Sequence, residues 1–180
     1  LSGYFSKGGD SQERVLMEPP LGLIALQSYL DREFKEKING KILKSALDFD
    51  SYEEMVKAIK DFKPDAICVS TMTFYKNFAH RAIKYIRDSN IKTPLFMGGP
   101  YTTGDYANAL QDENIDLCVL GEGELTLQDL IGRMINNNNQ LPSYDELKKI
   151  PGLAILKKSI LLSKDTSLNK KTIMQHDVAL

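Results

Sequence analysis

The stretch "IDLCVLGEGELTLQDLI" (115–131) joins an unbroken apolar run to an amphipathic pattern through a loop of alternating glycine and glutamate. The apolar run predicts a buried strand, and Leu127, Leu130, Ile131 and Met134 recur at helical spacing behind it. A strand that is buried on both faces belongs to a parallel sheet covered by helices. This stretch therefore predicts one strand–loop–helix unit of an α/β fold.

The same unit recurs along the chain. Strands are predicted at residues 1–5, 41–49, 65–73, 93–100 and 115–121, with amphipathic helices between them. Five alternations predict an α/β, doubly wound, flavodoxin-like (Rossmann-like) sheet of five parallel strands, in the order 2-1-3-4-5, with helices on both faces. The segment "PGLAILKKSILLSKD" (151–165) predicts a small C-terminal β-hairpin. We accordingly divide the chain into a domain of residues 1–138 and a linker, hairpin and tail of residues 139–180.

Composition excludes several classes of protein. The formal net charge of the 180 residues is −1, which offers no basic surface for nucleic acid or an anionic membrane. No apolar run reaches the roughly 20 residues that cross a bilayer. Cys68 and Cys118 each lie in an apolar run, and we expect buried free thiols in a reducing compartment, hence a cytoplasmic location. The chain opens without Met, and we expect it to be a fragment of a longer protein.

Ligands of such sheets bind beyond the carboxyl ends of the strands. Three predicted strands end in small, hydroxylated or glycine residues, which are Ser70, Thr71, Met72 and Thr73, then Gly98, Gly99, Pro100, Tyr101 and Thr102, then Gly121, Glu122, Gly123 and Glu124. One such end is typical of a turn, and glutamate at a helix N-terminus is favoured without any ligand. Three ends at one edge predict a crevice for a large ligand with a polar tail.

Catalytic patterns are missing from the sequence. It contains no G-x-S-x-G elbow, no phosphate loop of the G-x-x-x-x-G-K-[ST] type and no G-x-G-x-x-G after its first strand. His80 and His176 are expected to be unremarkable, and no His, Cys, Asp and Glu group has metal-ligand spacing. We therefore predict neither catalytic nor metal-ligating residues, and a chain that binds a ligand without breaking bonds alone.

Five segments in this order resemble one family, the N-terminal cobalamin (vitamin B12)-binding domain of cobalamin-dependent radical SAM enzymes. They are "PPLGLIALQSYL" (19–30), "KPDAICVSTMT" (63–73), "LFMGGPYTT" (95–103), "IDLCVLGEGELTLQDLI" (115–131) and "IPGLAILKKSILL" (150–162). The resemblance implies that cobalamin binds with its nucleotide tail in a slot made by Ser70 and Gly98-Gly99. Gly121 to Glu124 would wall the slot, Tyr101 and Thr102 would cover the tail, and Leu21 and Gly22 would face the corrin edge.

The match to the family pattern is incomplete. Ser70-Thr71-Met72 stands where related domains have S-x-L, and the loop of residues 6–18 has no histidine where they have D-x-H-x-x-G. The resemblance therefore implies base-off cobalamin without a histidine ligand. We also expect Gly121 and Gly123 to serve the ligand more than the turn, so that Gly123→Val costs affinity more than stability.

The catalytic half of such an enzyme is not in this sequence. Two distant cysteines cannot provide the C-x-x-x-C-x-x-C motif that holds a [4Fe–4S] cluster for S-adenosylmethionine chemistry. The resemblance implies a covalently linked radical SAM domain, in a methyltransferase or related radical enzyme whose substrate the sequence does not name. The alternative is a stand-alone flavodoxin-like module that binds FMN or a protein partner.

Overall fold

A computed structural model describes residues 19–156 and 176–178 of the chain. Its parallel strands are β1 (Ile67–Ser70), β2 (Leu95–Gly98) and β3 (Leu117–Val119), and β2 lies between the other two. These are the predicted third, fourth and fifth strands, in the predicted neighbouring order. Ser70 is paired in register with Gly98, so the strands end at one common edge of the sheet.

The rest of the sheet differs from the prediction. β4 (Leu153–Leu156) runs antiparallel to β3, and β5 (His176–Val178) runs antiparallel to β4. Five parallel strands are therefore not confirmed. β4 is the first half of the predicted hairpin, but its two described neighbours are β3 and β5, and residues 157–165 lie outside the described residues. The predicted strand at residues 1–5 also lies outside them.

The predicted strand at residues 41–49 is wrong. This segment forms a local turn in which the Asp48 carboxylate accepts a hydrogen bond from the Lys44 amide at 2.7 Å, and the Lys44 carbonyl accepts from the amides of Leu47 and Asp48. Ala46 has a φ of 66°, and only an isolated bridge joins Ser45 to Phe49. Local hydrogen bonding of an Asp side chain competes with sheet pairing, and here it prevails.

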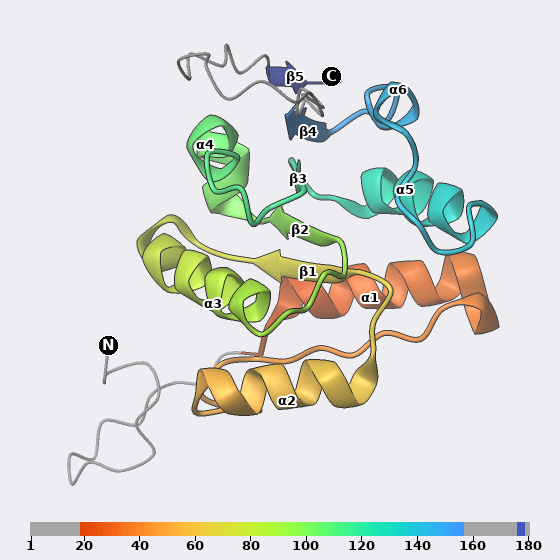
Figure 1. The fold of residues 1–180 in the computed structure, drawn as a ribbon. Coiled ribbons are helices and arrows are strands. Elements are labelled where there is room, and N and C mark those ends of the chain that lie inside the picture. Colours follow the sequence, from red (N-terminus) through yellow and green to blue (C-terminus); the bar gives the residue numbers. More distant parts are fainter. Residues whose placement is uncertain (1–18, 157–175, 179–180) are drawn as a thin grey trace, which may run out of the picture.

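Helices cover both faces of the sheet, as predicted (Figure 1). One core includes Leu95, Met97 and Cys118 of the sheet, and the other includes Phe96 and Leu117. The alternation follows from the two-residue period of a strand. The helices over the first face are α2 (Tyr52–Phe62), α3 (Lys76–Asp88) and α4 (Pro100–Ala109), and those over the second are α1 (Leu21–Phe34), α5 (Glu124–Asn136) and α6 (Tyr144–Leu147). Short 3-10 turns, η2 (Lys35–Lys37) and η3 (Thr73–Tyr75), follow α1 and precede α3.

The start of α2 is fixed by side chains that the sequence predicts as a capping pair. The Ser51 hydroxyl accepts a hydrogen bond from the Glu54 amide at 3.1 Å. The Glu54 carboxylate reaches back to the amide of Asp50 at 2.7 Å, one residue before the expected donor. Of the apolar stripe, Met55, Val56 and Ile59 are buried.

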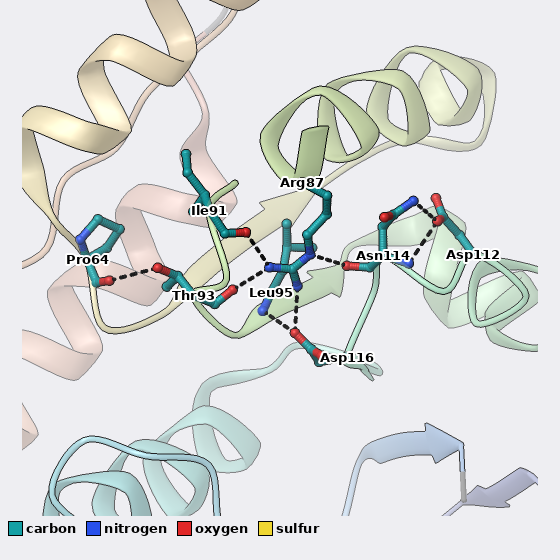
Figure 2. Close-up of polar contacts among 8 residues, drawn as sticks. All are labelled: Pro64, Arg87, Ile91, Thr93, Leu95, Asp112, Asn114 and Asp116. Atoms are coloured by element: carbon teal, nitrogen blue, oxygen red, sulfur yellow. Dashed lines mark hydrogen bonds and ion pairs between the residues drawn. The ribbon is translucent and has the colours of Figure 1, made fainter. Parts of the chain in front are cut away.

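Arg87, near the end of α3, ties together the amino ends of β2 and β3 (Figure 2). Its guanidinium donates four hydrogen bonds at 2.7 to 3.1 Å, to the carbonyl oxygens of Ile91, Thr93 and Asn114 and to a carboxylate oxygen of Asp116. The same oxygen of Asp116 accepts from the amide of Leu95, the first residue of β2, at 2.8 Å. The amino edge is therefore a closed polar cluster.

None of the helices in the described part of the chain is both long and apolar enough to cross a membrane.

Candidate functional site

The carboxyl edge of the sheet brings the predicted strand ends together. The amide of Thr71 donates to the carbonyl oxygen of Gly98 at 3.2 Å, which carries the pairing of β1 and β2 one residue past Ser70. A Cβ built on Gly98 would meet the Val119 carbonyl oxygen at 3.6 Å, so β3 ends beside it. Ser70 and Met72 are exposed here and Thr71 is buried. Ser70, Gly98 and the end of β3 therefore share one edge, as predicted.

The two neighbouring glycines at the end of β2, Gly98 and Gly99, differ in whether a side chain could fit at their position. Gly99 has a φ of 92° and a ψ of −176°, a conformation that is essentially confined to glycine. A Cβ on it would lie 2.8 Å from the Ser70 hydroxyl oxygen and 2.9 Å from the Thr71 carbonyl oxygen. Gly99 is thus required by the packing of β2 against β1. Gly98 has an ordinary φ and no contact closer than 3.6 Å for a Cβ, so its missing side chain leaves room at the edge.

Tyr101 and Thr102 lie behind the edge. Both side chains are buried, with 3% and 0% exposure, after the exposed Pro100 that begins α4. The Thr102 hydroxyl donates to the carbonyl oxygen of Gly99 at 3.0 Å, and the Tyr101 amide donates to that of Thr71 at 3.2 Å. In this structure the two residues therefore support the edge from within.

The loop of residues 121–124 adopts the backbone geometry of a turn. Gly121 and Gly123 have φ values of 72° and 88°, and Gly123 is the residue that caps α5. The Gly121 amide donates to the Thr103 hydroxyl at 3.1 Å, which joins this loop to α4. Positive φ alone accounts for both glycines. Valine at residue 123 would strain the backbone, so we expect Gly123→Val to cost stability as well as any affinity that it costs.

The start of α1 lies at the same edge. α1 and α5 run side by side in the same direction, because the Tyr29 hydroxyl donates to Gln128 at 2.6 Å and the ring of Phe34 packs at Gly132 (Figure 1). α5 begins at the carboxyl edge, just beyond β3, and so does α1. Leu21 is 70% exposed, and a Cβ on Gly22 would meet nothing within 4 Å.

An exposed apolar rim surrounds this edge, and the sequence prediction missed most of it. Six of the seven large hydrophobic side chains exposed in the described residues lie at the starts of α1 and α5 or just after β1. They are Leu21, Ile24, Met72, Phe74, Tyr75 and Leu125. The signal was available in "TMTFY" (71–75), where two aromatic residues follow the strand end and precede the buried face of α3. Exposed apolar side chains at these positions would suit a ligand with an apolar surface.

The described part of the chain contains two free cysteine thiols and no candidate metal site. No group of three or more His, Cys, Asp and Glu side chains within them could hold a metal ion. Cys118 is buried as expected, and burial raises the pKa of its thiol to about 12, so it stays protonated at neutral pH. Cys68, which we also expected to be buried, is exposed on β1.

An open depression of about 430 Å³ runs along the outer surface of α5 from Leu125, a residue of the apolar rim, to Asn136, and it lies beside Phe34. None of the predicted site residues lines it. Its charged residues, Arg133 and Asp129, already pair at 2.7 Å. The depression therefore offers no convergent polar groups, and the carboxyl edge is the better candidate site.

Comparison with known proteins identifies the family of this domain. The sequence matches the B12 binding domain family over residues 13–131, a span that contains every predicted site residue. It is also similar to an uncharacterized methyltransferase of Pyrococcus horikoshii, with 31% identity over 137 residues. That alignment covers 76% of this chain but only 28% of the relative, so the chain spans under a third of the curated protein that it matches. The chain belongs to the B12-binding domain family.

Proposed function

We propose that this chain binds cobalamin at the carboxyl edge of β1, β2 and β3, as the accessory domain of a larger enzyme. One observation carries the proposal: Ser70, Gly98 and the loop from Gly121 to Glu124 converge on one edge of a domain whose family binds B12.

The residues at this edge fit the chemistry of the cofactor. Cobalamin combines a wide macrocycle that has apolar edges with a polar nucleotide tail. The exposed Ser70 hydroxyl and the space beside Gly98 would receive the tail. The apolar rim, with Leu21 at the start of α1 and Phe74 after β1, would contact the corrin edge. When bound, the cofactor would supply a cobalt centre able to carry a methyl group.

We further propose that cobalamin binds base-off and without a histidine ligand. The sequence of residues 6–18 contains no histidine that could approach cobalt from below. His80 lies on α3 and is engaged with Asp112 and Tyr101, at 2.6 and 3.2 Å. These observations support a lower face that is not ligated by imidazole.

The larger enzyme is proposed to be a radical SAM methyltransferase or a related radical enzyme. Support comes from the relative, which is named as a methyltransferase and is much longer than this chain. In this proposal residues 1–138 form the cofactor domain, and residues 139–180 lead toward the catalytic domain, which holds S-adenosylmethionine and a [4Fe–4S] cluster. Both cysteines of this chain are free thiols, which fits the cytoplasm.

Titration of the purified chain with hydroxocobalamin tests the binding claim. We expect co-elution of the cofactor in gel filtration and a visible spectrum of the base-off form. An unchanged spectrum without co-elution would overturn the claim. FMN is the competing ligand, and binding of FMN in place of cobalamin would establish the flavodoxin-like alternative. For the larger enzyme, the gene should encode C-x-x-x-C-x-x-C beyond residue 180, and a stop codon there would contradict that part.

A further inference from the structure

The first turn of α4 connects all three strand ends. Gly99 packs against Ser70, and the amide of Tyr101 donates to the carbonyl oxygen of Thr71 at 3.2 Å, which joins the turn to β1. The Thr103 hydroxyl accepts from the amide of Gly121 at 3.1 Å, which joins it to the loop after β3. The orientation of this turn therefore sets how the three strand ends are placed relative to one another.

The remainder of α4 cannot hold this turn rigidly. Asp105 has a φ of −151° and a ψ of 48°, so the helix is kinked between its first turn and residues 106–109. A kink interrupts the continuous ladder of backbone hydrogen bonds that would otherwise transmit orientation along a helix. Side-chain contacts of the first turn can supply a further constraint, in addition to its backbone hydrogen bond to Thr71.

The side chain of Tyr101 supplies it. Its ring is buried, and its hydroxyl lies 3.2 Å from Nε2 of His80 on α3. Nδ1 of His80 lies 2.6 Å from a carboxylate oxygen of Asp112, which belongs to the segment between α4 and β3. Asp112 is held in turn by the amide and the side chain of Asn114, at 3.0 and 2.7 Å. A chain of hydrogen bonds thus runs from the α4–β3 segment through α3 to the first turn of α4.

The protonation states of Asp112 and Tyr101 at neutral pH bear on how these hydrogen bonds are made. Burial raises the pKa of Asp112, but hydrogen bonds from His80 and Asn114 outweigh it, and the net pKa lies below its usual range. The Asp112 carboxylate therefore accepts the Nδ1–H of His80. Burial raises the pKa of Tyr101, so its hydroxyl keeps its proton at neutral pH while it is hydrogen-bonded to Nε2 of His80.

We propose that His80 and Asp112 are positioning residues for the cofactor edge, acting through the Tyr101 hydroxyl on the turn from Gly99 to Thr103. The inference rests on the proposed cobalamin site. His80 and Asp112 contact none of the residues at the edge directly, so their effect on cobalamin is transmitted by the turn.

Tyr101→Phe tests this inference because it removes only the hydroxyl. Tyr85→Phe is the matched control, since it deletes a tyrosine hydroxyl from α3 that bonds Glu53 at 2.7 Å, away from the edge. We expect Tyr101→Phe to raise the dissociation constant for hydroxocobalamin about fivefold, which corresponds to one lost hydrogen bond. Tyr85→Phe should leave the constant unchanged, and both variants should have similar thermal midpoints.

Amide hydrogen exchange of the cofactor-free chain gives a second readout that does not depend on cobalamin. In Tyr101→Phe the amides of Tyr101, Thr103 and Gly121 should exchange faster, whereas the amide of Leu95 at the amino edge should not change. His80→Phe, which keeps a ring but no nitrogen, should speed the same three amides. If amides throughout the chain exchanged faster and the thermal midpoint fell, the hydrogen bonds would serve only general stability. That result would overturn the inference.

The two readouts separate the possible failures. If the wild-type chain does not bind hydroxocobalamin, the proposed function fails, and the inference fails with it as a statement about cobalamin. If the wild type binds but Tyr101→Phe changes neither affinity nor exchange at the edge, only the positioning role is overturned.

Discussion

The two edges of the same sheet are built in opposite ways. At the amino edge, one guanidinium donates four hydrogen bonds, and Asp116 accepts from both Arg87 and Leu95, so polar groups satisfy one another (Figure 2). At the carboxyl edge, an exposed hydroxyl at Ser70 and open space beside Gly98 lie within an exposed apolar rim. The amino edge holds the strands in register, and this leaves the carboxyl edge free to bind a ligand.

Among these variants, Arg87→Met should lower the free energy of unfolding the most. The change removes the Arg87 donor from three carbonyl oxygens and leaves the Asp116 carboxylate without its ion-pair partner, although Leu95 still donates to it, and the two side chains are only 18% and 29% exposed. We expect a loss of about 2–3 kcal/mol in the free energy of unfolding, less than for a fully buried pair. Chemical denaturation measures it, and the cobalamin affinity of the folded fraction should be unchanged. A large loss of affinity would mean that the edges are not independent.

Arg133→Met is the matched control for that variant. Arg133 pairs with Asp129 on the same helix at 2.7 Å, with both side chains more than a third exposed. Its removal should lower the free energy of unfolding far less than the loss of Arg87 does, because solvent screens an exposed ion pair. Equal losses for the two arginines would contradict a special role for the amino edge.

The next largest effect should come from Gly99→Ala, compared with Gly98→Ala. An alanine at residue 99 needs an unfavourable backbone conformation and collides with Ser70 and Thr71, which should cost about 2 kcal/mol of stability. At residue 98 the added methyl has room, so stability should change by less than about 0.5 kcal/mol. Gly98→Ala should instead weaken cobalamin binding, measured by spectral titration. The reverse pattern would remove Gly98 from the site.

Asp112→Asn should lower the free energy of unfolding by less, and the size of the loss should depend on pH. The folded pKa of Asp112 is lowered, so its contribution to stability is complete above the unfolded pKa of about 4 and disappears as pH falls through the folded value. The variant should be less stable than wild type by about 1 kcal/mol at pH 7. The difference should shrink in denaturation curves recorded at successively lower pH. A constant difference would assign the effect to shape rather than charge.

The smallest change in stability should accompany Phe74→Ser. The side chain is 69% exposed, so its loss should change the unfolding free energy by less than about 0.5 kcal/mol. If the apolar rim contacts the corrin edge, hydroxocobalamin should bind about threefold more weakly, because part of the buried apolar area is lost. Leu125→Ser, at the start of α5, provides an independent second measurement. Unchanged affinity in both variants would exclude the rim from the site.

The sequence predicts those parts of the fold whose patterns have one physical solution. The continuous apolar runs of β2 and β3 become strands that are covered on both faces, whereas β1 is buried only in part, and the apolar stripe of α2 becomes a helix. The segment of residues 41–49 failed because the Asp48 side chain bonds the backbone locally. The pairing of β4 with β5 could not be predicted, since it depends on contacts between distant and weakly patterned segments.

The sequence predicts the sheet edge at which we propose the site, but not the arrangement of the residues there. Glycine and hydroxyl residues after each strand were sufficient to identify the edge. Pattern alone could not separate Gly98, which leaves room, from Gly99, Gly121 and Gly123, whose positive φ values serve the backbone. It also could not show that Tyr101 turns inward to His80, because that contact joins residues on different helices.

The most direct test of the central claim is a titration of the ¹⁵N-labelled chain with hydroxocobalamin, followed by amide chemical shifts. We expect the amide chemical shifts of Ser70, Thr71, Gly98 and Gly121 to change in step with the visible spectrum. The amide chemical shifts of Leu95 and Asp116 should not change. Shifts confined to the amino edge, or to the outer surface of α5, would contradict it.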